Sequence, residues 1–202
     1  MKKALAIVAL VAAVFVAGNV QAQSTVYAAY APETFVVGNS NTNYQGFALG
    51  FTQNIDFAKG IGVAAGAQFR MNMKSESNTL LNVTETTKRS QILIDVPILF
   101  NYTIAVNRDL AIVPFVGPMP SLALTGSTKF SETLLGTTTT TDWYGDNSNQ
   151  SRFNLYAVFG ADVKFNNFNL FGGYRLGLLD LNKSNNATLK TNGMFVGIGY
   201  TL

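Results

Sequence analysis

The chain has 202 residues, of which only 12% are charged, with fourteen basic and eleven acidic side chains. This charged share is about half that of an ordinary soluble domain, which argues against a globular surface facing water. The sequence contains neither cysteine nor histidine, which excludes disulfides, thiolate metal sites and the commonest general base.

The first 22 residues have the three parts of a secretory signal peptide. Met1–Lys3 is basic, residues 4–18 are an apolar run, and Val20–Ala22 offers small residues for cleavage. A membrane anchor is the alternative, but the run is shorter than the roughly 20 residues a spanning helix needs. We expect residues 1–22 to be removed, leaving residues 23–202 as one outer-membrane β-barrel domain. Two basic residues leave with the signal, so the mature chain is nearly neutral and predicts no nucleic-acid partner.

Period-two alternation is clearest in residues 44–73. Odd positions there are bulky and apolar, even positions are small or polar, and a short turn at 58–60 divides two long runs. Such alternation predicts paired β-strands with one apolar face. Eight alternating segments are predicted along the chain, at residues 25–37, 44–57, 61–73, 88–104, 110–125, 151–165, 168–180 and 189–202.

The predicted connections fall into two sets. Tight turns follow every second segment, at 58–60, 106–109 and 166–167. Longer polar loops follow the others, at 38–43, 74–87, 126–150 and 182–187. An up-and-down meander places the two sets at opposite ends, which is typical of outer-membrane barrels. The tight turns and both termini are then periplasmic, the long loops are extracellular, and half an aromatic girdle is predicted at the turn end, from Phe57, Tyr102, Phe165, Phe168 and Tyr200.

We therefore predict an all-β fold, an eight-stranded antiparallel up-and-down transmembrane β-barrel in the bacterial outer membrane, with the apolar face toward lipid. A soluble lipocalin-like ligand-binding barrel with its bulky face inward is the alternative. The interior of eight strands barely accommodates side chains, so the small-residue face fits inside better. Prolines at 114, 118 and 120 conflict with a regular closed strand. They predict a bulge, a strand end or a misplaced strand in segment 110–125.

Charged residues collect on the predicted inner face, at Arg70, Arg89, Asp95, Asp162, Lys164 and Arg175. Arg70, Asp95 and Arg175 fall at similar heights above the tight turns. Because buried charges must be paired, we expect these three to form an ion network. Two functions are open to such a network, a structural plug or a path for protons or ions. The narrow bore favours the plug.

The predicted loop 126–150 carries four candidate contact residues, Asp142, Trp143, Tyr144 and Asp146. Exposed loop aromatics suit contact with a ligand or receptor; the alternatives are insertion into the lipid interface and folding over the barrel mouth. The acidic residues and Asn147 offer oxygen ligands for calcium, but their spacing matches no EF-hand loop. No metal site, cofactor or catalytic set is predicted.

Five short motifs stand out from strand four onward: DVPILF at 95–100, VPFVGP at 113–118, FGADVKF at 159–165, GYRLGL at 173–178 and FVGIGY at 195–200. Together they resemble the PorT-like outer-membrane β-barrel family common in Bacteroidetes. The resemblance spans essentially the whole mature chain and implies the barrel architecture. Some members of that family are linked to protein secretion.

The leading functional prediction is a non-enzymatic integral membrane protein that acts through its surface loops or as an accessory of envelope or secretion machinery. Its expected partners are outer-membrane lipid, the barrel-assembly machinery during biogenesis, and envelope or secretion proteins. A narrow channel for small solutes or ions is the alternative function.

Overall fold

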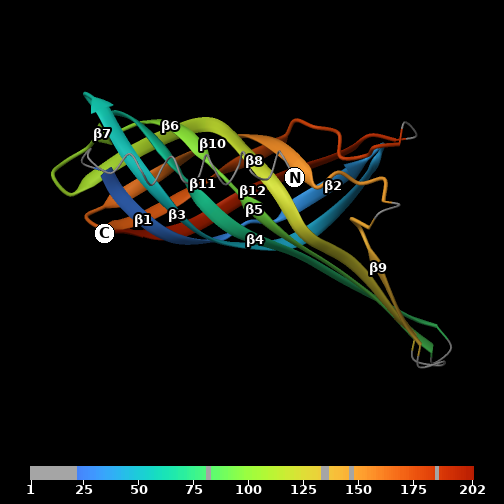
Figure 1. Ribbon diagram of the computed structural model, residues 1–202. Helices are drawn as coiled ribbons and strands as arrows, with labels where there is room; N and C mark the ends of the chain where they lie inside the picture. The colour runs from blue at the N-terminus through green and yellow to red at the C-terminus, as the bar shows by residue number, and fades with distance from the viewer. Residues whose placement is uncertain (1–21, 81–82, 133–136, 146–147, 185–186) are drawn as a thin grey trace.

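The computed structural model describes residues 22–80, 83–132, 137–145, 148–184 and 187–202 (Figure 1). The predicted signal peptide lies almost wholly outside them. The strands are β1 Ala22–Tyr30, β2 Glu33–Val37, β3 Ser40–Ala58, β4 Ile61–Leu80, β5 Val83–Asp95, β6 Ile98–Tyr102, β7 Ile104–Ala105, β8 Leu110–Glu132, β9 Thr138–Asp142, β10 Phe153–Phe165, β11 Phe168–Gly177 and β12 Leu189–Thr201. Among the described residues, no helix has the length and apolar character needed to cross a membrane.

These strands close into a ring of eight antiparallel staves. β1 and β2 together make the first stave, β5, β6 and β7 make the fourth, and β9 folds back as a hairpin onto β8. The ring closes because β1 and β2 both pair with β12, from Thr25 opposite Thr201 to Val37 opposite Leu189. The predicted eight-stranded meander is confirmed.

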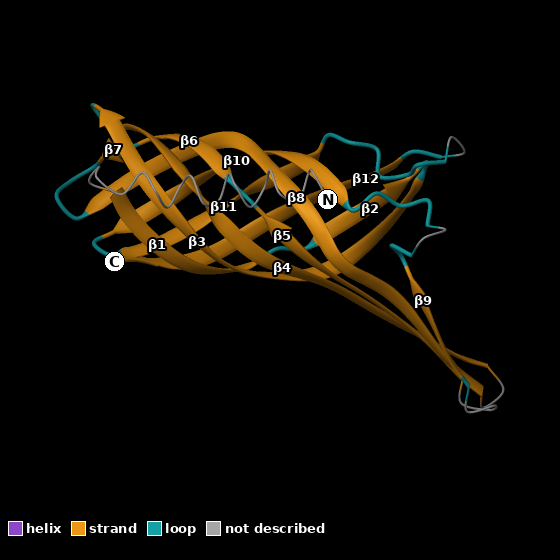
Figure 2. Ribbon diagram, in the orientation of Figure 1, coloured by secondary structure: helices purple, strands orange, loops and turns teal. Residues whose placement is uncertain are grey.

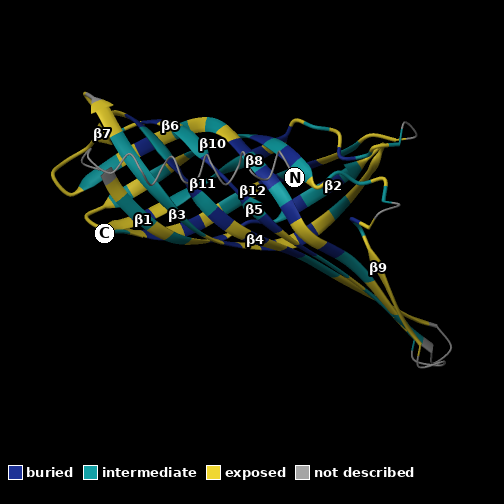
Figure 3. Ribbon diagram, viewed as in Figure 1, coloured by how far each residue is buried: buried dark blue, intermediate teal, exposed yellow. Residues whose placement is uncertain are grey.

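The apolar face of the strands points outward. In β3, Phe47 and Leu49 are 52% and 66% exposed, whereas Ala48 between them is 3% exposed. The same alternation of exposed and buried positions runs along the barrel wall (Figure 3). All five predicted girdle residues at the turn end are exposed. The bulky face therefore lies outside, and the soluble barrel with reversed parity is wrong.

The tight turns form where their residues allow a positive φ. Lys59 and Gly60, with φ of 46° and 84°, connect β3 to β4 in two residues. Positive φ at both positions is the backbone of a type I′ turn, whose twist matches that of the flanking strands. Asn166 at φ 52° begins the equally short turn between β10 and β11. The predicted tight turns are confirmed here.

Segment 110–125 is a continuous strand despite its prolines. In an antiparallel ladder, the N–H and C=O of one residue point to the same neighbouring strand. The Pro120 carbonyl accepts a hydrogen bond from the Val96 N–H, 2.9 Å away. The backbone nitrogen of Pro120, which has no hydrogen to donate, therefore faces the fourth stave. The nitrogen of Pro118, two residues earlier, faces the same stave. That stave is broken between β5 and β6 at residues 96–97. Pro118 and Pro120 therefore lie where no regular ladder requires a donor. The same break explains why Val96 is fully buried, although it has the same parity as the exposed Ile92 in this segment.

Two predicted loops contain long strand segments. β4 and β5 continue through 74–87 with only residues 81–82 undescribed, and β8 and β9 pair within 126–142. Together they make a four-stranded extension, the projecting sheet, of residues 74–80, 83–90, 127–132 and 138–142. It extends well past the barrel (Figure 2). The loop prediction failed because these strands are polar on both faces and show no apolar alternation, although threonine favours β-structure.

Candidate functional site

The charged interior is built at two strand breaks. The first stave is interrupted at Ala31 and Pro32, directly before Glu33, and the fourth is interrupted at residues 96–97, directly after Asp95. Each break contains a proline, which cannot donate to a ladder. The two carboxylates therefore enter the lumen from irregular backbone on opposite sides of β3 and β4.

Arg70 on β4 bridges the two carboxylates. Its Nε donates to Asp95 Oδ2 at 2.8 Å, and its Nη1 forms an ion pair with Glu33. Asp95 also accepts hydrogen bonds from Gln68 Nε2 at 2.7 Å and from Ser121 Oγ at 2.5 Å. All three charged side chains are at most 2% exposed. Buried ions are tolerated when their partners are this complete.

Tyr156 completes the network from β10. Its hydroxyl donates to Glu33 Oε1 at 2.5 Å, and its ring lies 5.3 Å from the Arg70 guanidinium carbon. Asn72 donates to the other oxygen of Glu33. The network thus spans the lumen from β2 through β4 to β10, which gives it the geometry of a plug.

Arg175 lies next to this network without an ion pair among the described residues. It is 2% exposed, and its Nη2 donates to the carbonyl oxygens of Ala31 at 3.1 Å and Pro32 at 3.2 Å. These carbonyls are free because the first stave breaks there. Gly193 allows the approach, since a Cβ at that position would collide with the Pro32 carbonyl.

The other three predicted luminal charges lie elsewhere. Arg89 shares the face of its strand with Gln91 but sits beyond the network, where its Nη1 reaches Glu76 at 3.5 Å. Asp162 and Lys164 line the opposite end of the lumen, near the tight turns, and Asp162 accepts a hydrogen bond from Asn169 Nδ2 at 2.7 Å. These three residues lie on the predicted inner face of their strands, but their contacts are with Glu76 and Asn169 and not with the network around Arg70.

The aromatic loop pair folds over the barrel mouth. Tyr144 is 7% exposed, and Trp143 packs against Phe35 and Tyr44, with ring centroids 6.2 Å away from each. Burial raises the pKa of Tyr144 to about 12, so its hydroxyl stays protonated and accepts a hydrogen bond from Gln91 at 2.5 Å. Tyr144 therefore lies inside the barrel mouth, as the fold-over alternative predicts, and Trp143 is half-buried beside it. Asp142 is exposed, and its Oδ1 accepts a hydrogen bond from the Tyr144 N–H at 2.8 Å. Asp146 lies outside the described residues.

Glu33 and Tyr156 were missed by the sequence reasoning. The signal for Glu33 was present, since Pro32-Glu33 interrupts an otherwise alternating segment. An acidic residue at such a break is free to turn into the lumen. Tyr156 lies on the inner parity of its segment, but nothing in the pattern distinguishes it from a packing residue.

Apart from Leu80, Val83 and Phe130, the residues of the projecting sheet are polar. Cross-strand hydroxyl pairs connect Ser77 to Thr86 at 3.1 Å, Thr79 to Thr84 at 3.0 Å, and Ser131 to Thr138 at 3.3 Å. Beyond Met73, β4 pairs only with β5 among the described strands, so its other edge is open. Among the described residues, no cluster of three or more acidic side chains could hold a metal ion.

Comparisons with known proteins agree with the β-barrel fold. The profile of the outer membrane protein beta-barrel domain matches residues 13–183, whereas no curated protein sequence matches significantly. Neisserial surface protein A is 13% identical, with 89% of this chain and 97% of that chain covered and a TM-score of 0.51.

Two further solved structures are similar at lower TM-scores. Ail, the attachment invasion locus protein of Yersinia pestis, solved with a heparin analogue, is 18% identical, with 90% and 99% covered and a TM-score of 0.47. A major outer membrane protein from Thermus thermophilus is 12% identical, with 90% and 99% covered and a TM-score of 0.47. At these identities, structural likeness concerns the fold alone.

Proposed function

The chain belongs to the outer membrane protein β-barrel domain family, and we propose that it is a non-enzymatic surface protein that uses its projecting sheet to bind a partner macromolecule outside the cell. The tight turns and the termini then face the periplasm. The single observation that carries this proposal is the length of the sheet strands.

A transmembrane β-strand needs only about 9–11 residues to cross the bilayer. β4 has 20 residues and β8 has 23, about twice that requirement. The surplus residues are almost all polar, as a water-exposed sheet requires. A structural barrel alone needs none of this extra length, so the extension favours a role outside the membrane.

The open edges of the projecting sheet suit backbone recognition. An exposed edge strand presents unpaired N–H and C=O groups that can pair with a strand of another chain. Residues 74–80 of β4 have such an edge, and Lys74 and Glu76 on it form an ion pair at 2.8 Å. Exposed ion pairs contribute little stability, so we assign these charges to solubility and partner selection.

Site-specific photocrosslinking on living cells tests the proposal. A photoreactive phenylalanine analogue replaces Asn78 on the projecting sheet, and the matched control places it at Lys59 in the tight turn. Both side chains are exposed, but they lie at opposite ends of the barrel. We expect discrete adducts of one size from Asn78 that are absent from Lys59. The absence of adducts from Asn78, or identical adducts from both positions, would overturn the proposal.

A channel is the competing function. The network of Glu33, Arg70, Asp95 and Tyr156 crosses the lumen with every member buried, which supports a closed bore. We expect purified protein in planar bilayers to show no stable conductance steps. Reproducible steps that change when Arg70 is replaced would favour the channel instead.

A more specific version of this proposal is that the protein acts as an accessory of secretion machinery. The five motifs that resemble the PorT-like barrels support it. The identity of the Asn78 adduct separates the two forms, because a secretion accessory would be linked to an envelope protein of the same cell and an adhesive protein to a foreign surface.

A further inference from the structure

The lumen on the turn side of the network contains a cavity of about 130 Å³. It runs from Arg175, beside the plug, toward Lys164 and Asn169 near the tight turns. A buried cavity of about 150 Å³ is large enough to hold a benzene ring. The space therefore suits a small molecule with a single ring, entering from the turn end.

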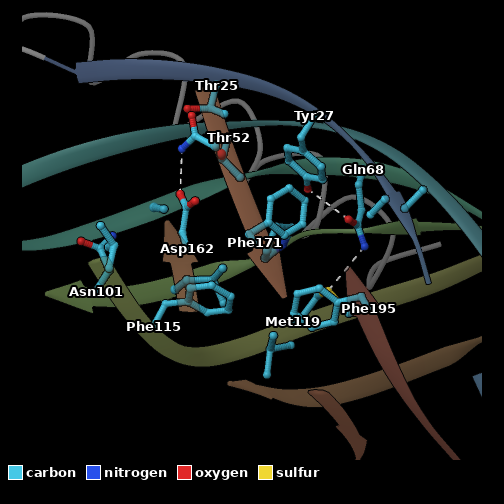
Figure 4. Close-up of a pocket in the computed structure, with 18 of the residues that line it drawn as sticks. Thr25, Tyr27, Thr52, Gln68, Asn101, Phe115, Met119, Asp162, Phe171 and Phe195 are labelled. Atoms are coloured by element: carbon cyan, nitrogen blue, oxygen red, sulfur yellow. Dashed lines mark hydrogen bonds between the residues drawn. The ribbon is translucent and has the colours of Figure 1, made fainter. Parts of the chain in front are cut away.

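Aromatic rings form the walls of this cavity (Figure 4). Phe171 meets Tyr27 edge to face with ring centroids 5.3 Å apart, and Phe195 lies 6.3 Å from both Phe171 and Phe115. Each ring is seated on a glycine of a neighbouring strand, where a Cβ would collide with it: Phe115 on Gly160, Phe195 on Gly173, Phe171 on Gly197 and Tyr27 on Gly50. The walls are therefore held in place before any ligand enters, and aromatic ligands pack well against such rings.

Arg175, at the deep end of the cavity, carries an unsatisfied cationic donor. Arg175 lines the cavity and is only 2% exposed, and its Nε finds no hydrogen-bond partner among the described residues. Leaving a buried charged donor unpaired costs more than leaving a neutral one. A ligand carboxylate at this position would accept a charge-assisted hydrogen bond, which is among the stronger kinds. The Phe195 ring, 5.8 Å from the Arg175 guanidinium carbon, flanks the same place.

The outer end of the cavity is polar. Asn101 and Asp162 line it there, and each has a buried Oδ1 without a partner among the described residues. These acceptors suit water or a ligand hydroxyl at the entrance. The cavity thus has a donor at its floor, apolar rings in the middle and acceptors at its mouth.

We propose that this cavity binds a small aromatic carboxylate, with the ring packed against the wall formed by Tyr27, Phe171 and Phe195 and the carboxylate on Arg175 Nε. The cavity lies inside the barrel, so this proposal does not depend on any partner of the projecting sheet. It assigns the barrel a second role, the capture of small aromatic acids from the turn side.

Binding of benzoate to the purified full chain, folded in dodecyl maltoside micelles, tests the proposal. The NMR signal of carboxyl-labelled ¹³C-benzoate reports saturable binding. Val113→Phe fills the cavity, since Val113 lines it and is 4% exposed. Val116→Phe is the matched control, because Val116 lies on the same strand but is 57% exposed on the outer face. Uptake of benzoate by the micelle is the same for both variants.

We expect saturable binding by the natural chain and by Val116→Phe, with affinity reduced about tenfold or more in Val113→Phe. No saturable binding by the natural chain, or equal binding by the two variants, would overturn the proposal. Toluene is the uncharged analogue and should bind about tenfold more weakly than benzoate. Arg175→Met should remove that difference. If this variant does not fold, equal affinity of the natural chain for both molecules still overturns the role of Arg175.

Discussion

The carboxylate of Asp95 is fully buried and accepts hydrogen bonds from Arg70, Gln68 and Ser121. Asp95→Ala leaves the Arg70 guanidinium with one carboxylate instead of two. Removing one partner of a buried ion pair typically costs about 3–5 kcal/mol, so the folded band on a semi-native gel should lose heat resistance. Asp56→Ala is the control, because Asp56 is exposed at the turn end. Equal heat resistance of Asp95→Ala and the natural chain contradicts the plug.

Asp180 offers a pH-dependent contact in the loop between β11 and β12. Hydrogen bonds from the backbone N–H groups of Leu189 and Asn182, at 2.8 and 2.9 Å, hold the pKa of its carboxyl below the ordinary value. A depressed folded-state pKa means that these bonds stabilise the loop fully above the ordinary carboxyl pKa. That contribution is lost as the pH falls through the folded-state value.

The amide proton shifts of Leu189 and Asn182 in micelles should therefore titrate with a midpoint below about 3.9, the ordinary aspartate value. Asp180→Asn should abolish this titration because the amide has no carboxyl group to protonate. A midpoint at or above the ordinary value would show that the two backbone bonds do not form in solution.

Pro118 and Pro120 lie beside the break in the neighbouring stave. Pro118 lies opposite Ala157 on β10, and its nitrogen faces the β5–β6 break. The N–H of Ala157 instead faces the intact β11. Ala157→Pro should therefore lower the free energy of unfolding by about 3 kcal/mol or more, whereas Pro118→Ala should change it by less than about 1 kcal/mol. Urea unfolding in micelles measures both, and similar effects of the two changes would contradict this account.

The alternating apolar pattern predicted the membrane-embedded strands and which of their faces points outward, because one face must meet lipid. It could not predict the strands beyond the membrane, where Ser77, Thr79 and their partners are polar on both faces. Nor could it place Glu33, since strand breaks remove the regular parity on which side-chain direction depends. Arg175 was predicted to lie beside Arg70 and Asp95, but its carbonyl partners arise only from the break at Ala31 and Pro32.

The orientation of the whole molecule depends on which end of the barrel faces outward. The chain has no cysteine, so a single introduced thiol reports its own location. Asn78→Cys places the thiol on the projecting sheet, and Lys59→Cys places it in the tight turn between β3 and β4. Both native side chains are exposed, so reactivity with a membrane-impermeant maleimide depends on access.

On intact cells, we expect Asn78→Cys to be labelled and Lys59→Cys to remain unlabelled, because a folded bilayer-embedded barrel separates the two ends. After the outer membrane is permeabilised, both should be labelled equally. The opposite pattern on intact cells would place the projecting sheet in the periplasm and direct the search for its partner there. It would also make the cavity open toward the outside, since the cavity extends toward the tight turns while the network bounds its other end.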